Sequence, residues 1–184
     1  MAIAAKSMCA VIPTRGDVSM DEIVQHLYSY PEVAEVKVIV GTTTFNRYLT
    51  ASEAKQDIIY TQDDDCITDL RPLIRNYEPG IIVNAMTRAH ARIYRRAQTL
   101  IGFGAIFDKS LVASVMDAKW ERDGLFYSKA DRIFATVNQH NTVFPKIRIL
   151  PYAEDQDRLY RQHDHGEKVQ AMNLRIRAIT GIRA

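Results

Sequence analysis

Apolar and polar positions along the chain predict strands separated by helices. Residues 9–12 and 36–40 are short, mostly β-branched or small apolar runs, which are typical of buried strands. Between them, apolar residues at 20–28 recur at the i, i+3, i+4 and i+7 spacing of one helical face. Ser19 and Glu22 have the spacing of a capping box at the start of that helix. This span therefore predicts a strand–helix–strand unit with a parallel, right-handed crossover.

The rest of the chain continues the alternation. Further strands are predicted at residues 57–61, 81–83 and 147–150, with an apolar, glycine-containing segment at 100–107. Helices are predicted at residues 69–76, 111–116, from 131 onwards and over 159–182. Residues 42–55 show no clear period beyond a helical turn at 51–55, and the basic stretch 86–99 is a loop or a surface helix. The pattern predicts an α/β fold whose parallel or mixed sheet carries helices on both faces.

Length and composition fit a globular protein of this class. The chain has 184 residues, 47% hydrophobic and 25% charged, which suits one domain over residues 1–184 and does not indicate disorder. Cys9 and Cys66 stand among apolar residues and are expected to be small buried side chains. No apolar run is long enough to span a bilayer and no hydrophobic signal region is present. We therefore expect a cytoplasmic protein without a membrane partner.

Positive charge is concentrated in two places although the formal net charge is only +2. One cluster comprises Arg88, Arg92, Arg95 and Arg96. The other lies near the end of the chain and comprises Arg158, Arg161, Lys168, Arg175, Arg177 and Arg183. Such clusters are usually solvated surface, but they can also bind the phosphates of a nucleotide or of a nucleic acid.

An acidic triplet is the strongest chemical signal. Asp63, Asp64 and Asp65 directly follow the predicted strand at 57–61, and ligands of α/β sheets bind beyond the carboxyl ends of strands. Adjacent carboxylates repel one another unless a cation compensates, and Mg²⁺ or Mn²⁺ prefers such oxygen ligands. The alternative is an acidic turn in which Asp65 caps the next helix.

Histidines near the end of the chain could extend this site. His163 and His165 flank Asp164, and imidazole is a good ligand for Mn²⁺. A surface position on the way into a helix would explain them equally well. Together with the triplet they suggest one mixed carboxylate/imidazole metal site.

Asp131 and the segment Gly102-Phe103-Gly104 are further candidates. Asp131 precedes an apolar helical pattern, so it is either the N-cap of that helix or a general base beside a pocket. Glycines inside an apolar strand mark a bend or the close approach of a ligand. The chain has no GxGxxG, GxxxxGK[ST] or GxSxG motif.

The order of these signals resembles the GT-A-fold glycosyltransferases, in particular the small, inverting, family-2-like enzymes. Ile58-Ile59-Tyr60-Thr61-Gln62-Asp63-Asp64-Asp65 is similar to their DXD motif. The resemblance implies that Asp131 is the catalytic base and that Asp65 binds the metal with His165, or alternatively His163. It further implies contacts to the donor nucleotide-sugar from Pro13, Thr14, Arg15, Asp63, Asp64, Gly102 and Gly104, with Arg88 or Lys168 assisting the leaving diphosphate.

The function implied is metal-dependent transfer of a sugar from a nucleoside-diphosphate-sugar, by default a UDP-sugar, to a hydroxyl. The acceptor could be a saccharide, a protein or a hydroxymethylated base in phage DNA. One alternative is a nucleotidyltransferase, which would usually carry a glycine-rich loop after the first strand, where only Gly16 stands. The other is a nucleic-acid-binding module, which would have no use for the acidic triplet.

Overall fold

The computed structural model describes residues 4–41, 43–93, 100–151 and 163–182. Strands and helices alternate along the chain, as the hydrophobic pattern predicts. The described strands are β1 (Met8–Thr14), β2 (Val33–Val40), β3 (Ile58–Thr61), β4 (Cys66–Thr68), β5 (Ile82–Ala85), β6 (Ala105–Asp108), β7 (His140–Val143) and β8 (Ile147–Ile149). The described helices are α1 (Asp21–Tyr28), α2 (Phe45–Ser52), α3 (Arg71–Asn76), α4 (Arg88–Ile93), α5 (Ala113–Met116), α6 (Gly124–Val137) and α7 (His165–Thr180), with a short 3-10 helix, η1 (Lys109–Val112).

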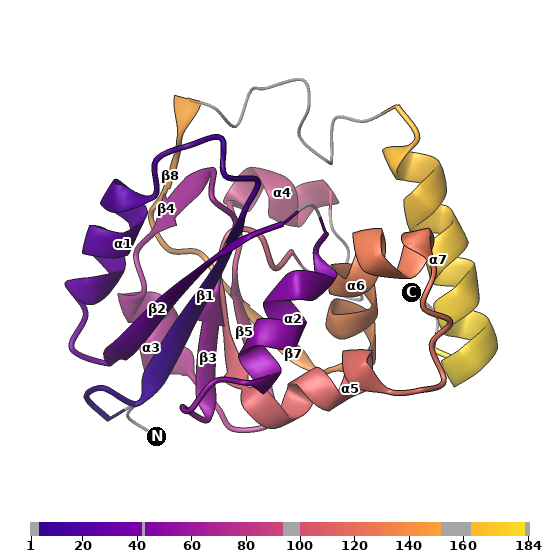
Figure 1. The fold of residues 1–184 in the computed structure, drawn as a ribbon, viewed down its shortest axis with the longest axis horizontal. Helices are drawn as coiled ribbons and strands as arrows, with labels where there is room; N and C mark the ends of the chain where they lie inside the picture. The colour runs from indigo at the N-terminus through magenta and orange to yellow at the C-terminus, as the bar shows by residue number, and fades with distance from the viewer. Residues whose placement is uncertain (1–3, 42, 94–99, 152–162, 183–184) are drawn as a thin grey trace.

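Six of these strands form one mixed sheet in the order β2-β1-β3-β6-β5-β7 (Figure 1). β1 is parallel to β2 and β3, and β5 is parallel to β7. β6 runs antiparallel to both of its neighbours, β3 and β5. β4 and β8 pair in a separate two-stranded antiparallel sheet. The predicted α/β fold with a mixed sheet is therefore confirmed.

Helices cover both faces of the sheet, and the alternation of side chains along β1 shows why. Cys9 and Val11 point into a core shared with α2, α5, α6 and α7. Met8, Ala10 and Ile12 point into the opposite core, which is shared with α1 and α3. Because neighbouring strand residues point to opposite faces, a strand that is apolar at every position must be covered twice. Figure 1 shows the two helical layers on either side of the strands.

The topology gathers several loops at one edge of the sheet. β1 and β3 are parallel, so their carboxyl ends meet at the same edge. β6 is antiparallel to β3, with Ala105 opposite Thr61, so the glycine-containing segment before β6 reaches that edge as well. Asn84 of β5 also faces Ala105, so the end of β5 lies close by. This edge brings together the segments that follow β1, β3 and β5.

The predicted helix starts were wrong at two places. α1 begins at Asp21, and its N-cap position is Met20, which provides no side-chain cap. Ser19 lies one residue earlier; its hydroxyl donates to Asp21 Oδ2 over 3.0 Å and its Oγ accepts from the Asp21 N–H over 3.3 Å. Asp131 is not an N-cap either, since it lies inside α6. The cap of α6 is Asp123, whose carboxylate accepts a hydrogen bond of 2.8 Å from the backbone N–H of Phe126.

Other elements differ in extent. β1 continues through Pro13 to Thr14, and β6 begins only at Ala105, after both glycines. α2, β4 and β7 were not predicted. Residues 94–99 of the basic stretch and residues 159–162 of the expected final helix lie outside the described residues. Within the described part of the chain, no helix has both the length and the apolar character needed to cross a membrane.

Candidate functional site

The acidic triplet lies at the carboxyl edge of the sheet, directly after β3. The backbone N–H of Asp63 donates to the Gly102 carbonyl over 2.7 Å, and the N–H of Leu150 donates to the Asp65 carbonyl over 2.8 Å. The Asp64 side chain is buried, whereas Asp63 and Asp65 are partly exposed. The predicted position at a strand end is confirmed, and the triplet connects β3 to β4.

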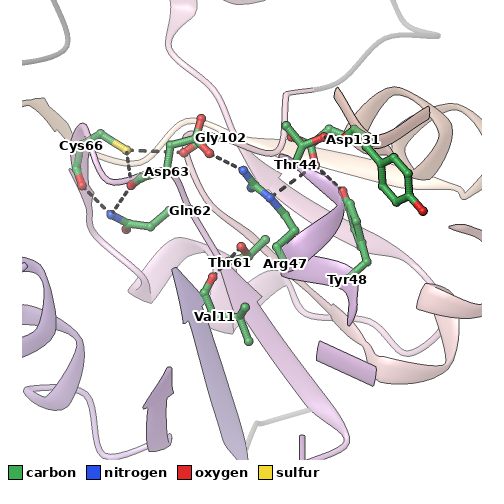
Figure 2. A network of polar contacts seen from close by, with 11 residues as sticks. Val11, Thr44, Arg47, Tyr48, Thr61, Gln62, Asp63, Cys66, Gly102 and Asp131 are labelled. Atoms are coloured by element: carbon green, nitrogen blue, oxygen red, sulfur yellow. Dashed lines mark hydrogen bonds and ion pairs between the residues drawn. The ribbon is translucent and has the colours of Figure 1, made fainter. Parts of the chain in front are cut away.

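A buried arginine joins the triplet to Asp131 (Figure 2). Arg47 comes from α2, is 3% exposed, and forms an ion pair with the Asp63 carboxylate through Nη2. Its Nε lies 3.4 Å from Asp131 Oδ1. Burial alone would lower the pKa of Arg47, but the carboxylates of Asp131 and Asp63 outweigh it and raise the pKa above the ordinary value. Arg47 is therefore a fixed positive charge between two carboxylates.

Asp131 projects from α6 toward this arginine. Its Oδ1 also accepts a hydrogen bond of 2.7 Å from the hydroxyl of Tyr48, a buried residue of α2. The Asp131 side chain retains 27% exposure. Burial raises the pKa of Asp131 above the usual value for an aspartate, while Arg47 acts in the opposite direction. The result is an oriented carboxylate that is a stronger base than a free aspartate and can still be reached from outside.

Lys129 lies two residues before Asp131 at a break in α6. Its backbone angles, φ −126° and ψ 22°, depart from the helical region and mark a kink. The side chain is 5% exposed and its Nζ lies 3.0 Å from His165 Nδ1. Lys129 and His165 therefore join α6 to the start of α7.

The two glycines are required by close contacts with other site residues. A Cβ on Gly102 would lie 2.2 Å from Asp63 Oδ2. Gly104 has φ +123°, and a Cβ there would lie 2.7 Å from the Tyr60 hydroxyl. The Tyr60 hydroxyl in turn donates to Gln62 Oε1 over 2.7 Å, which supports the residue before the triplet. These glycines let the segment before β6 pack directly against the triplet.

The remaining predicted residues lie in different surroundings. Pro13 and Thr14 end β1 at the same edge, and Thr14 Oγ1 accepts from the Gly16 N–H over 3.1 Å. Arg15 forms an ion pair with Asp17. Two further basic residues are already engaged elsewhere: Lys168 pairs with Asp164 at 2.7 Å, and Arg88 stacks over the ring of Phe144 at 5.4 Å.

The predicted metal site, Asp65 with His165 or His163, stays a prediction. Nowhere in residues 4–41, 43–93, 100–151 and 163–182 do three His, Cys, Asp or Glu side chains converge as metal ligands would. His165 Nδ1 lies 3.0 Å from Lys129 Nζ. His163 is exposed. Of the predicted ligands, Asp65 remains at the strand end.

Arg47, Tyr48 and Lys129 are site residues that sequence reasoning missed. Phe45, Tyr48 and Ala51 form the buried face of α2, and Arg47 is buried beside them. The helix is short and its apolar residues are few, so no period was evident in 42–55. The sequence shows Arg47 and Tyr48 side by side, before the triplet. Only the fold shows that they contact Asp63 and Asp131.

A surface cavity of about 690 Å³ lies away from this edge, beside the turn between α1 and β2. Its lining includes Tyr30, Asp69 and Arg71. Asp69 and Arg71 bind each other through two hydrogen bonds of 2.8 Å, so these two charges compensate each other. We place the candidate site at the carboxyl edge, where buried charges converge.

No family model matches the sequence, and no curated protein matches it either. Solved structures do match. The catalytic domain of Drosophila β1,4-galactosyltransferase 7, in complex with xylobiose, is similar with a TM-score of 0.55 and 15% identity, over 89% of this chain and 79% of that chain. Glucosyl-3-phosphoglycerate synthase from Mycobacterium tuberculosis, in complex with Mg²⁺ and UDP, gives a TM-score of 0.54 and 14% identity, over 94% and 80%.

The chain has the GT-A glycosyltransferase fold. This confirms the fold that the sequence resemblance implied. The two helical layers around the sheet are those of Figure 1.

Proposed function

We propose that this GT-A protein transfers a sugar from a nucleoside-diphosphate-sugar to a hydroxyl group, with Asp131 as general base. The observation that supports this most directly is the buried link from Asp63 through Arg47 to Asp131. It fixes a basic carboxylate beside the acidic triplet, at the edge where α/β sheets bind ligands. The GT-A fold raises the expectation of this chemistry by analogy.

The donor nucleotide is proposed to lie along the ends of β1 and β3. Pro13, Thr14 and Arg15 would contact the nucleoside, and Asp63 would face the ribose. Asp63 keeps 43% exposure of its side chain despite the ion pair with Arg47, so one face of the carboxylate is open to a ligand. UDP is the default nucleotide, and it is the one bound in the mycobacterial synthase of the same fold.

A divalent cation, Mg²⁺ or Mn²⁺, is proposed to bind with the donor. Such cations are commonly held by one or two carboxylates together with substrate phosphates and water. The carboxylates of Asp65 and Asp64 would be the protein ligands of the cation. The donor phosphates would supply the ligands that the described protein residues do not. When bound, the cation would neutralise charge on the departing diphosphate.

The proposed reaction follows from the position of Asp131. The acceptor hydroxyl gives its proton to the Asp131 carboxylate as its oxygen forms a bond to the anomeric carbon. The bond from that carbon to the diphosphate oxygen breaks, and the diphosphate leaves with the electron pair. Attack from the side opposite the leaving group inverts the anomeric configuration. Arg47 and Tyr48 hold the carboxylate oxygen in place during the transfer.

The acceptor is proposed to bind next to α4 and the segment before β6. His90 contacts the Phe103 ring at 4.9 Å between centroids, and Arg88 lies over Phe144. Aromatic and basic groups together suit a sugar ring or a nucleobase with its phosphates. A hydroxymethylated DNA base is therefore kept as a candidate acceptor, although Arg95 and Arg96 of the basic cluster lie outside the described residues.

A donor-hydrolysis screen tests the proposed function. Nucleoside-diphosphate-sugars of different base and sugar would be incubated with the protein and Mn²⁺, and release of the nucleoside diphosphate would be measured. We expect hydrolysis of at least one donor, abolished in Asp65→Ala. A protein that neither binds nor hydrolyses any of these donors does not have the proposed function.

A further inference from the structure

The outer side of β2 is a free sheet edge among the described residues. β2 and β7 lie at the two ends of the six-stranded sheet, and β1 is the partner of β2 among the described strands (Figure 1). β2 is eight residues long, and its Val38 and Val40 are 41% and 70% exposed. A long edge strand of this kind presents unpaired backbone groups to any strand that can align with it.

The backbone of β2 alternates between β1 and this free edge. The Gly41 N–H donates to the Thr14 carbonyl over 2.8 Å, so the odd-numbered residues direct their backbone groups toward β1. The Val36 N–H instead donates to the Tyr28 hydroxyl over 3.2 Å, outside the sheet. Since the N–H and C=O of one residue point to the same side and the sides alternate along a strand, Val36 and Val38 direct theirs outward.

Two opposite charges flank Val36 on one face of β2. Glu35 Oε2 lies 4.0 Å from the Sγ of Cys9, whose side chain belongs to the core on the α2 side. Lys37, two residues further along the strand, shares this face, and its Nζ lies 4.0 Å from Glu35 Oε2. Both side chains are partly exposed, so both charges can pair with a second strand placed at this edge.

The charges select one register for a second copy of the same strand. In an antiparallel pair, facing residues point to the same side of the sheet, so a two-fold axis between two β2 strands passes through one residue number. An axis at Glu35 or at Lys37 would place like charges opposite each other, which is destabilising. An axis at Val38 would place Lys37 opposite Ile39 and leave the charges unmatched. An axis at Val36 places Glu35 opposite Lys37 of the second copy, twice by symmetry.

We infer that two copies of this chain join through their β2 edges, antiparallel about a two-fold axis at Val36. The two Val36 residues exchange backbone hydrogen bonds, and the carbonyl of the second copy replaces the hydroxyl of Tyr28, a residue that is 53% exposed. Val38 faces Ala34 of the second copy, a residue that β1 skips in its own pairing with β2. The exposed Val38 side chain is thereby covered, and the two six-stranded sheets form one continuous sheet.

Paired charge reversals test this register by sedimentation velocity across micromolar concentrations. Lys37→Glu leaves two carboxylates on each strand and Glu35→Lys leaves two ammonium groups, so either variant alone should dimerise about tenfold more weakly, or worse, than the unmodified chain. An equimolar mixture of the two variants restores both opposite-charge pairs and should form a heterodimer about as tightly as the unmodified chain dimerises. Lys55→Glu is the control, because it makes the same charge change at an exposed residue before β3 and should not alter self-association.

Sedimentation of the unmodified chain as a monomer at every concentration would overturn the inference. A dimer that persists in both charge variants would overturn it too, because the copies would then meet through another surface or in another register. If a charge variant fails to fold, Val38→Pro takes its place: proline removes an outward N–H that a strand added at this edge would use, so this variant should be monomeric, and a dimer that persists refutes the pairing. None of these results depends on sugar transfer, so the proposed function stands or fails separately.

Discussion

Replacing Asp131 by asparagine separates its chemical role from its structural one. Asparagine keeps the Oδ1 that accepts from the Tyr48 hydroxyl at 2.7 Å and lies 3.4 Å from Arg47 Nε. What it loses is the ability to take a proton. Loss of a general base lowers a rate by about 10²–10⁴-fold, which corresponds to about 2.7–5.4 kcal/mol in activation free energy. We expect sugar transfer to fall by that factor while donor affinity is preserved.

The stability of this variant follows from the sign of the pKa shift. The pKa of Asp131 is raised in the folded protein, mainly by burial. Folding therefore favours the protonated carboxyl, and this contribution to stability is present at low pH and lost as pH rises through the folded-state pKa. At neutral pH the ionised carboxylate costs stability. Asp131→Asn removes that cost, so its melting temperature at pH 7 should be unchanged or higher.

Asp131→Ala is the matched control for the contacts. It takes the hydrogen-bond acceptor away from the buried Tyr48 hydroxyl and the counter-charge away from Arg47, and leaving a buried donor unsatisfied costs about 1–3 kcal/mol. For a chain of this size the melting temperature falls by about 2–4 °C per kcal/mol. We expect alanine to lower both stability and rate, and asparagine to lower the rate alone.

The assays are single-turnover transfer, calorimetric donor binding and thermal melting of the three proteins. Asp131→Asn that transfers sugar within about threefold of the unmodified rate would refute the assignment of the base. Equal loss of donor binding and transfer would refute it as well, because Asp131 would then act on the donor. The acid limb of the transfer rate should lie above the pKa of about 3.9 of an ordinary aspartate, since the raised pKa controls it.

Other substitutions test the rest of the site. Arg47→Met leaves two carboxylates facing each other without their counter-ion and should lower stability by about 3–5 kcal/mol, measured by urea unfolding. Gly102→Ala should displace the Asp63 carboxylate and weaken UDP binding about tenfold or more with little change in melting temperature, because its Cβ would lie 2.2 Å from that carboxylate. Asp65→Ala should abolish Mn²⁺-dependent nucleotide binding and leave the far-ultraviolet spectrum unchanged. Hydrogen bonds lower the pKa of Asp123 to about 2, so its contribution to stability should disappear between about pH 4 and pH 2, and Asp123→Asn should flatten this part of the pH–stability curve.

The central strands were predictable because they are buried on both faces. β1, β3 and β5 are mostly apolar and almost fully buried, as two helical layers require. β2, at the end of the sheet, is only partly buried and was predicted from its β-branched residues. β7 was not predictable on this basis, because its residues His140-Asn141-Thr142-Val143 are mostly polar and it pairs only with β5, at the end of the sheet. β4 has three residues and gains its strand geometry from pairing with β8. Long-range pairing, which no local pattern encodes, decides such short elements.

The chemistry was predictable where the residue type itself carries it. The acidic triplet could be recognised from its position after an apolar strand, and the segment around Gly102 and Gly104 from its composition. Which residue caps α6 could not be predicted, because Asp123 and Asp131 both precede apolar helical positions. The fold distinguishes them: Asp123 caps α6 and binds Arg175 at 2.7 Å, whereas Asp131 turns toward Arg47. His165, whose role as a metal ligand stays a prediction, also lies 3.0 Å from Lys129, which no sequence pattern connects to it.

Arg47 gives the acidic triplet a role beyond that of a metal motif. A buried arginine between two carboxylates is seldom the most stable arrangement, because apolar residues of similar volume are often neutral or stabilising in such positions. Its presence is explained if Asp63 and Asp131 must be held in fixed positions while each keeps one side open to a ligand, and both side chains do keep partial exposure. The Arg47 guanidinium then orients both carboxylates: Asp63, at the proposed donor site, and Asp131, at the proposed acceptor site. Donor binding at Asp63 should therefore change the environment of Asp131, and the pKa that governs transfer in the donor complex should differ from that of the free protein.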